Sequence, residues 1–211
     1  VATDASDVEE DWEQRWRRFH KPVEAGGLWI GPPWETPVGG LPTVIVDPGQ
    51  AFGTGAHATT RGCLELMLGL ADRGEASGPL EDWGTGSAVL AIAAAKLGWE
   101  PVGGCDHETA AIEAANANAA ANDVAVTLRR VNLREARPPA APTVTANLTA
   151  PLLLPLAGRM AAGEIERPTT MVISGLLTSE ADRVQEAFRE AGLSAQTVVP
   201  IGEWTALLLR G

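Results

Sequence analysis

The stretch Asp82-Trp-Gly-Thr-Gly-Ser-Ala88 follows a short apolar segment, 80–83, and opens a segment with helical spacing, 88–97. A strand, a glycine turn and a helix in this order are typical of nucleotide-binding α/β proteins. Upstream lies a second glycine stretch, Asp47-Pro-Gly-Gln-Ala-Phe-Gly-Thr-Gly-Ala-His-Ala-Thr-Thr60. One glycine turn is common, but two with a helix between them predict two backbone walls that close on one small molecule.

Helical and strand patterns alternate regularly from residue 59 onward. We expect helices at 59–71, 88–97, 109–121, 152–160 and 179–191, and strands at 80–83, 101–105, 124–131, 143–146, 171–174, 195–200 and 204–210. Only Ile201-Gly-Glu203 separates the last two strands, which is too short for a crossover helix, so these strands should pair as an antiparallel hairpin. The sequence therefore predicts an α/β fold, with a seven-stranded, mostly parallel sheet that ends in an antiparallel hairpin.

The chain divides into an N-terminal arm, 1–46, and a main domain, 47–211. In the arm, Trp12, Trp16 and Phe19 recur at helical spacing, which predicts a short helix with an aromatic stripe. We expect this stripe to dock on the main domain.

Composition places the chain among soluble globular proteins, because 45% of its 211 residues are hydrophobic and 20% are charged. No apolar run is long enough to span a bilayer, and the first residues lack the pattern of a signal peptide, so no membrane partner is expected. Two cysteines cannot form a disulfide framework, which favours a reducing cytoplasm. The three histidines are far apart and share no ligand spacing with the cysteines, so no metal site is expected.

The net charge of −11 argues against a nucleic-acid partner, because phosphate binding requires basic clusters. Arg15-Trp-Arg-Arg18 is the only such cluster in the sequence. An acidic surface can attract a basic protein substrate, although acidity also serves simply to keep a protein in solution.

The spacing of the second glycine turn and the next acidic residue indicates an adenosine-type ligand. Gly84 and Gly86 have no side chain, so their backbone can approach a ligand closely. The helix N-terminus behind them favours a negative group such as a phosphate or a carboxylate. Asp106 ends the next strand, where an acidic side chain typically binds both ribose hydroxyls.

Three adenosine cofactors compete for such a site. A dinucleotide fingerprint would need a third glycine at position 89, which is Val89, and no G-K-[ST] follows for an ATP phosphate loop. The remaining pattern, D-x-G-x-G-x-A, suits S-adenosylmethionine, and the terminal antiparallel hairpin is also typical of methyltransferase sheets.

The chain resembles the PrmA family, the lysine methyltransferases of ribosomal protein L11, along nearly its whole length. The matching stretches are Asp11-Trp-Glu-Gln-Arg-Trp16, Lys21-Pro22, Pro48–Thr60, Asp82–Gly98, Asp106 with Ala114-Ala-Asn-Ala-Asn118, Ala146-Asn-Leu-Thr-Ala150, Ser174-Gly-Leu-Leu177 and Glu203-Trp-Thr-Ala-Leu207. The resemblance implies a Rossmann-like methyltransferase fold with S-adenosylmethionine as cofactor. It also implies a basic, lysine-bearing protein as substrate, either a ribosomal protein or another one.

The same resemblance implies where the cofactor is bound. We expect cofactor contacts at Thr60, Asp82, Gly84, Thr85, Gly86, Asp106, His107, Asn132 and Asn147. Asn147 belongs to the family's N-[IL]-x-A motif and is also expected to be catalytic, because it ends the fourth strand where a target amine would meet the methyl group. Phe52 is the second expected catalytic residue, packing on the cofactor or on the target lysine, with a purely structural role in the loop as the alternative. His57 is expected to order the glycine segment rather than to act as a base.

Few catalytic side chains are needed, because a sulfonium is already an activated methyl donor and the enzyme mainly aligns the reacting groups. A lysine must attack as the neutral amine, and its reference pKa is about 10.4. An apolar pocket lowers that pKa, and the Asn147 carbonyl can orient the amine. We expect direct displacement without a covalent enzyme intermediate.

The chain departs from the family pattern in three respects. Ala88 and His107 stand where relatives normally have a glycine and a second acidic residue, and the family's N-terminal substrate-recognition domain is missing. The missing domain leaves open a fragment of a longer protein or a short relative with another substrate. The leading hypothesis is a protein N-methyltransferase. A methyltransferase for another protein or a small molecule, and a non-catalytic adenosyl-ligand binding module, are the alternatives.

Overall fold

A computed structural model describes residues 20–48 and 55–211 of the chain. Its main feature is a seven-stranded sheet with the strand order β6-β5-β4-β7-β8-β10-β9. These strands are β4 (Leu80–Trp83), β5 (Val102–Asp106), β6 (Val126–Arg130), β7 (Thr143–Asn147), β8 (Thr170–Leu177), β9 (Ser194–Ile201) and β10 (Trp204–Arg210). Strands β4 to β8 pair in parallel, whereas β10 runs antiparallel to both β8 and β9. The predicted fold class and its terminal hairpin are confirmed.

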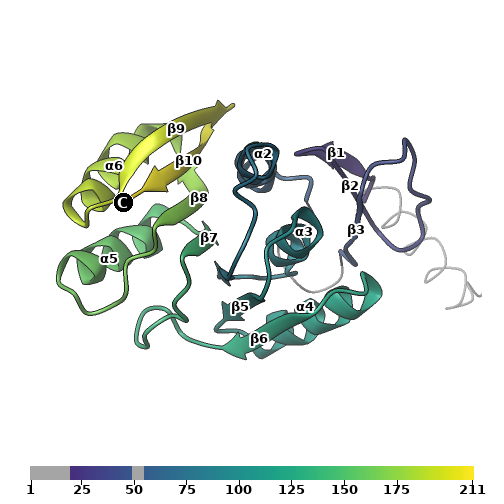
Figure 1. The fold of residues 1–211 in the computed structure, drawn as a ribbon, viewed down its shortest axis with the longest axis horizontal. Helices are drawn as coiled ribbons and strands as arrows, with labels where there is room; N and C mark the ends of the chain where they lie inside the picture. Colours follow the sequence, from purple (N-terminus) through teal and green to yellow (C-terminus); the bar gives the residue numbers. More distant parts are fainter. Residues whose placement is uncertain (1–19, 49–54) are drawn as a thin grey trace, which may run out of the picture.

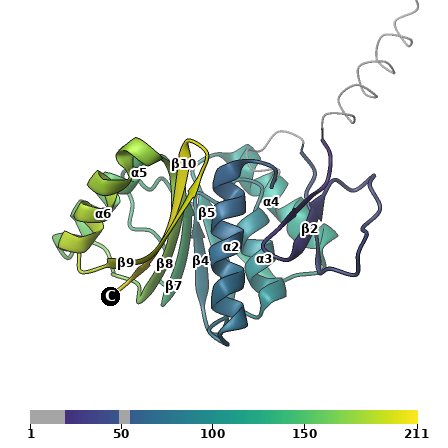
Figure 2. The same cartoon turned by 90° about the horizontal axis from the view of Figure 1, so that it is seen from above.

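Five α-helices cover the two faces of this sheet (Figure 1). They are α2 (Ala58–Asp72), α3 (Val89–Leu97), α4 (Thr109–Ala121), α5 (Ala150–Ala161) and α6 (Ala181–Glu190), with a 3₁₀ turn, η1 (Thr178–Glu180), before the last. Helices α5 and α6 lie on one side of the sheet, and α2, α3 and α4 lie on the other (Figure 2). Each expected helix is present, with ends that differ by a few residues.

The covered faces explain why the sheet's strands are apolar. In β10 the five residues from 205 to 209 are all buried, because helices pack on both faces of this strand's sheet. One hydrophobic cluster joins α5 and α6 to the sheet and includes Leu153, Val184 and Phe188. A second cluster joins α2 and α3 to the opposite face and includes Met67 and Ile92. Two apolar layers therefore hold the sheet between them.

A separate three-stranded sheet lies beyond α3 (Figure 2). Strand β2 (Leu28–Gly31) pairs antiparallel with β1 (Val23–Ala25) and parallel with β3 (Thr43–Ile45). Its apolar side chains Leu28 and Ile30 belong to the same cluster as α2 and α3. This part of the arm packs on the main sheet's helices, and the expected boundary at residue 46 stays a prediction. The expected aromatic stripe and basic cluster fall within 1–19, outside the described residues.

The point where the sheet's strand order reverses lies at β4. The chain passes from β4 to β5 on one side and later reaches β7 on the other. Open parallel sheets bind their ligands at the carboxyl ends of the strands next to such a point. The ends of β4, β5 and β7 are therefore where a site is expected.

Candidate functional site

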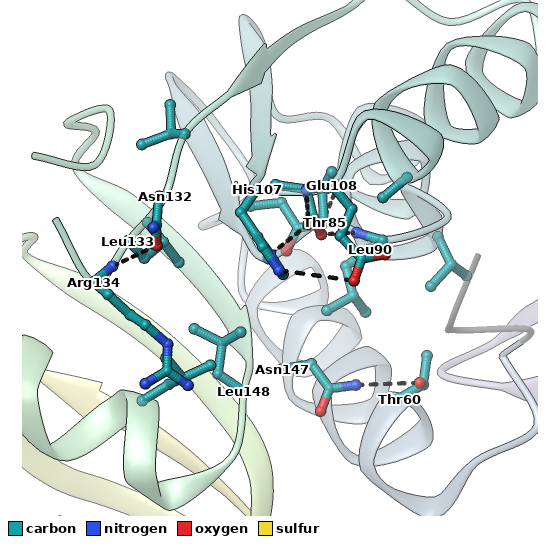
Figure 3. Close-up of a pocket in the computed structure, with 18 residues that line it drawn as sticks. Thr60, Thr85, Leu90, His107, Glu108, Asn132, Leu133, Arg134, Asn147 and Leu148 are labelled. Carbon is teal, nitrogen blue, oxygen red and sulfur yellow. Dashed lines mark hydrogen bonds and ion pairs between the residues drawn. The ribbon is translucent and has the colours of Figure 1, made fainter. Parts of the chain in front are cut away.

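A cavity of about 360 Å³ opens at the carboxyl ends of β4, β5 and β7. Nine residues expected from the sequence to contact a cofactor line it: Thr60, Asp82, Gly84, Thr85, Gly86, Asp106, His107, Asn132 and Asn147. Figure 3 shows several of them facing the same space from separate elements. Phe52 lies outside the described residues. The structure thus gathers these side chains, and their individual roles stay predictions.

The glycine turn after β4 forms one wall of the cavity. Gly84 has φ +75° and Gly86 has φ +53°, a region that residues with a side chain rarely adopt. The N–H groups of Gly84 and Thr85 both donate to the carbonyl of Cys105, at 2.8 and 2.9 Å, which fixes the turn against β5. A Cβ atom at Gly84 would collide with the side chain of Leu148. The absence of a side chain at Gly84 therefore lets the turn and the chain after β7 pack together.

Ala88 adopts the left-handed conformation immediately before α3, with φ +64° and ψ +19°. This conformation costs about 1–2 kcal/mol for a residue with a Cβ atom. Its N–H group donates to the carbonyl of Thr85 at 2.8 Å, and its side chain is fully buried. The glycine expected at this position would adopt the same backbone without that strain. The chain tolerates alanine here at a local energetic cost.

Asp106 links the end of β5 to the glycine turn. Its Oδ2 atom accepts a hydrogen bond from the Gly86 N–H at 3.0 Å, and its Oδ1 atom accepts one from the Glu108 N–H at 3.1 Å. Only 12% of the side chain is exposed. A carboxylate oxygen has more than one lone pair, so the two oxygens can also accept from a pair of ligand hydroxyls. The backbone bonds hold the carboxylate in place for that purpose.

His107 follows Asp106 and lies at the mouth of the cavity. Its Nδ1 atom is 3.2 Å from Asp106 Oδ1, and its Nε2 atom is 3.7 Å from Glu108 Oε1. The ring is largely exposed. Two carboxylates therefore fix the ring edge, which leaves a ring face available to a ligand.

Asp82 is buried beneath the turn with 1% of its surface exposed. The hydroxyls of Thr85 and Thr145 each donate to its carboxylate at 2.7 Å. Burial raises the pKa of Asp82 to about 6, and the two hydroxyl bonds oppose that shift. Thr145 was not expected from the sequence as part of the site. Its position two residues before Asn147 on β7 puts both on one face of the strand, a signal that could have identified it.

Asn147 ends β7 and points toward the N-terminal turn of α2 (Figure 3). Its Nδ2 atom donates to the Thr60 hydroxyl at 3.3 Å, which turns the amide oxygen toward other partners. Thr60 is fully buried. The position of the Asn147 side chain therefore depends on where α2 begins.

His57 caps the N-terminus of α2. Its Nδ1 atom accepts a hydrogen bond from the Thr59 N–H at 3.4 Å and lies 2.8 Å from the Thr59 hydroxyl. The imidazole also contacts the Trp204 ring edge-to-face, with the centroids 5.1 Å apart. Both contacts agree with the expected ordering role of His57.

Apolar side chains supply walls that the sequence analysis did not identify. These are Val89, Leu90, Ala111, Val131, Leu133, Leu148 and Leu152. Leu133 follows Asn132 in the loop after β6, where Asn132 Oδ1 accepts from the Arg134 N–H at 3.1 Å. Arg159 supports the same loop, because its guanidinium donates to the Leu133 carbonyl at 2.9 Å. Residues in loops show no periodic pattern, so sequence alone gave no signal for these walls.

The cavity combines an apolar slot, a carboxylate at the end of β5 and a bare backbone turn. This donor set fits an adenosyl ligand with a charged amino-acid tail, as the sequence predicted. Within residues 20–48 and 55–211, no group of three or more His, Cys, Asp or Glu side chains gathers to hold a metal ion. In the same part of the chain, no helix has the length and apolar character needed to cross a bilayer.

Sequence comparisons relate the chain to one family. The family model described as ribosomal protein L11 methyltransferase (PrmA) matches residues 3–211. A protein of Geobacter sulfurreducens named ribosomal protein L11 methyltransferase is 40% identical over 207 residues, or 96% of this chain and 67% of that protein. One of the same name in Pelotomaculum thermopropionicum is 38% identical, over 96% of this chain and 66% of that protein. The chain spans 64% to 68% of the length of such relatives.

Solved structures agree with these sequence matches. The ribosomal protein L11 methylase of Lactobacillus delbrueckii subsp. bulgaricus superimposes with a TM-score of 0.77 at 28% identity, covering 90% of this chain and 98% of that one. An RNA methyltransferase of Salinibacter ruber in complex with S-adenosylhomocysteine gives a TM-score of 0.52 at 22% identity, covering 68% and 86%. The second likeness concerns the fold alone.

Proposed function

The chain belongs to the ribosomal protein L11 methyltransferase (PrmA) family, and from this premise we propose that it transfers a methyl group from S-adenosylmethionine to an amino group of a protein. One observation carries the proposal. The glycine turn after β4, the carboxylate of Asp106 and the amide of Asn147 all line one cavity.

Each part of the cavity has a role in holding the methyl donor. Asp106 would accept hydrogen bonds from the two ribose hydroxyls, as acidic residues after the second strand of such folds do. Gly84 and Gly86 would let the methionine part lie against the backbone, and the buried carboxylate of Asp82 would offset its ammonium charge. Leu133 and Leu152 would provide apolar contact for the adenine.

The bound cofactor would supply a methyl group on a positively charged sulfur, which makes the methyl group reactive without further activation. The protein's part is to bring an amine into line and to keep it neutral. Asn147 is suited to this task, because Thr60 holds its Nδ2 atom and the amide oxygen can then accept from the amine. The partly buried end of β7 would also lower the pKa of a lysine amine placed there.

The proposed acceptor is a lysine or N-terminal amine of a basic protein, such as a ribosomal protein. The chain carries a net charge of −11, which attracts a basic partner at low ionic strength. The two cysteines are free and buried, which is compatible with the reducing cytoplasm where ribosomal proteins are found.

Two measurements test this function. Calorimetry should show saturable binding of S-adenosylhomocysteine, and Asp106→Ala should raise the dissociation constant at least tenfold, because a charged hydrogen-bond acceptor contributes about 1.5–3 kcal/mol. Labelled S-adenosylmethionine should then transfer its methyl group to protein in a cell lysate, and to purified ribosomal protein L11. Label in small metabolites alone would contradict a protein acceptor. Binding without transfer to any acceptor would contradict catalysis.

A further inference from the structure

Two asparagines on α4, one helical turn apart, face the chain where it leaves β3. Asn118 is 3% exposed and Asn122 is 7% exposed, although most polar side chains of this helix point to solvent. Buried amides are costly unless they are hydrogen-bonded, so their partners indicate what they do. Both asparagines bond to main-chain groups outside their own helix.

Asn118 bonds to both of the chain segments that the sequence marks with glycine stretches. Its Oδ1 atom accepts from the Asp47 N–H at 3.0 Å, and its Nδ2 atom donates to the Ser87 carbonyl at 2.9 Å. Asp47 is the first residue of the stretch that reaches Thr60, and Ser87 directly follows Gly86. One side chain therefore fixes the distance between the chain after β3 and the turn that lines the cavity.

Asn122 holds the neighbouring residue of the same strand end. Its Oδ1 atom accepts from the Ile45 N–H at 2.8 Å, and its Nδ2 atom donates to the Ile45 carbonyl at 2.6 Å. Strand β3 pairs with β2 on one edge, so Asn122 satisfies main-chain groups on the other edge. Nδ2 also donates to the Asn118 carbonyl at 2.8 Å, which ties the two asparagines into one unit.

We propose that Asn118 is a positioning residue for the cofactor site, which acts by holding the chain at Asp47 and the glycine turn at Ser87 in one fixed arrangement. This proposal rests on the proposed function. An amide is suited to the role because it offers one donor and one acceptor on the same rigid group. Asn118 does not line the cavity itself, so its effect on a ligand passes through Ser87 and the adjoining Gly86.

The test compares Asn118→Ala with Asn116→Ala on the same helix. Asn116 is exposed and donates only to the Ile112 carbonyl within α4, which makes it a matched control. Calorimetry with S-adenosylhomocysteine should show at least a tenfold rise in the dissociation constant for Asn118→Ala and less than a twofold change for Asn116→Ala. Circular dichroism and thermal unfolding would show that both variants fold. Equal affinity of folded Asn118→Ala and the wild-type chain would overturn the positioning role alone. Failure of the wild-type chain to bind would overturn this role and the proposed function together.

A second measurement uses the wild-type chain and does not depend on whether the variant folds. Amide hydrogen exchange at single-residue resolution should slow at Asp47 and Ile45 when S-adenosylhomocysteine is added, because binding at the turn would stabilise the bonds that Asn118 and Asn122 make. Exchange at the exposed end of α4 should not change. Unchanged protection at Asp47 in the presence of saturating S-adenosylhomocysteine would contradict the coupling.

Discussion

The side chain of Leu148 occupies the space that a Cβ atom on Gly84 would need. On the other side, a Cβ atom on Gly175 would come within 2.6 Å of the Leu148 carbonyl oxygen. The chain that follows Asn147 is therefore held between two glycines, one in the turn after β4 and one in β8. The placement of the Asn147 amide depends on both contacts.

Gly84→Ala should weaken cofactor binding strongly, because the new methyl group would push the turn away from Leu148. We expect at least a tenfold rise in the dissociation constant for S-adenosylhomocysteine, measured by calorimetry. Gly74→Ala is the matched control, since Gly74 has a similar φ of +73° but no atom within 4 Å of an added Cβ. Both changes should lower stability by about 1 kcal/mol through the backbone conformation. Equal affinity of the two variants would contradict the steric role.

Asn147→Ala should reduce turnover much more than cofactor affinity. The amide oxygen is expected to orient the attacking amine, and loss of a single oriented hydrogen bond in a transition state commonly reduces the rate about 10²–10³-fold. Thr60→Val removes the hydroxyl that accepts from Nδ2, so it should lower kcat in the same direction but less. Steady-state kinetics with labelled S-adenosylmethionine separate kcat from KM. An equal loss of affinity and turnover in Asn147→Ala would refute the proposed role.

Asp82→Asn should stabilise the fold at neutral pH while it weakens cofactor binding. The pKa of Asp82 is raised to about 6 by burial, whereas an unfolded aspartate has a pKa near 3.9. The folded state therefore binds the proton more tightly, so the destabilisation is complete above pH 6 and disappears as the pH falls toward about 4. At pH 7.5 we expect Asp82→Asn to be about 2 kcal/mol more stable in urea unfolding.

The same comparison at pH 4.5 provides the control for Asp82. There the stability difference between Asp82→Asn and the wild-type chain should shrink, because the wild-type carboxyl group is then mostly protonated in the folded state. Glu81 and Asp106 both raise the pKa of Asp82 further, so their titration acts in the same direction. A variant that is less stable than the wild type at pH 7.5 would contradict the linkage.

Asp123→Gly should stabilise the chain without affecting binding. Asp123 is exposed, follows the C-terminus of α4 and has φ +54°. Glycine removes the backbone strain and also removes a negative charge from a helix C-terminus, where it is unfavourable. We expect a gain of about 0.5–1 kcal/mol, or a few degrees in Tm. Asp123→Ala keeps the strain, so an equal Tm for the two variants would count against this explanation.

Much of the fold follows from local patterns in the sequence. The bounds of β4 and α4 agree with the prediction, because short apolar strands and alanine-rich helices are determined by residues near one another. The hairpin of β9 and β10 followed from the length of its turn. The small sheet of β1, β2 and β3 was expected only as fragments, since the parallel pairing of β2 with β3 joins segments across a loop that has no periodicity.

The candidate site was predictable where one element followed another along the chain. Gly84 and Asp106 follow two neighbouring parallel strands, so their approach could be inferred from spacing alone. The contacts of Leu148 with Gly84, of Thr145 with Asp82, and of Asn118 with Asp47 join residues distant in sequence. Such contacts depend on side-chain packing in three dimensions, and no local signal specifies them.

Strand β10 lies between β8 and β9, so the strand that precedes it in the chain has no partner until β10 is in place. A nascent chain that has emerged only as far as β9 would present a bare edge on β8 and an unpaired neighbour, both open to wrong partners. Synthesis of the protein is thus exposed to misassembly until its final strand leaves the ribosome. Shortening the chain within β10 should then promote aggregation, even though the cavity lies at other strands.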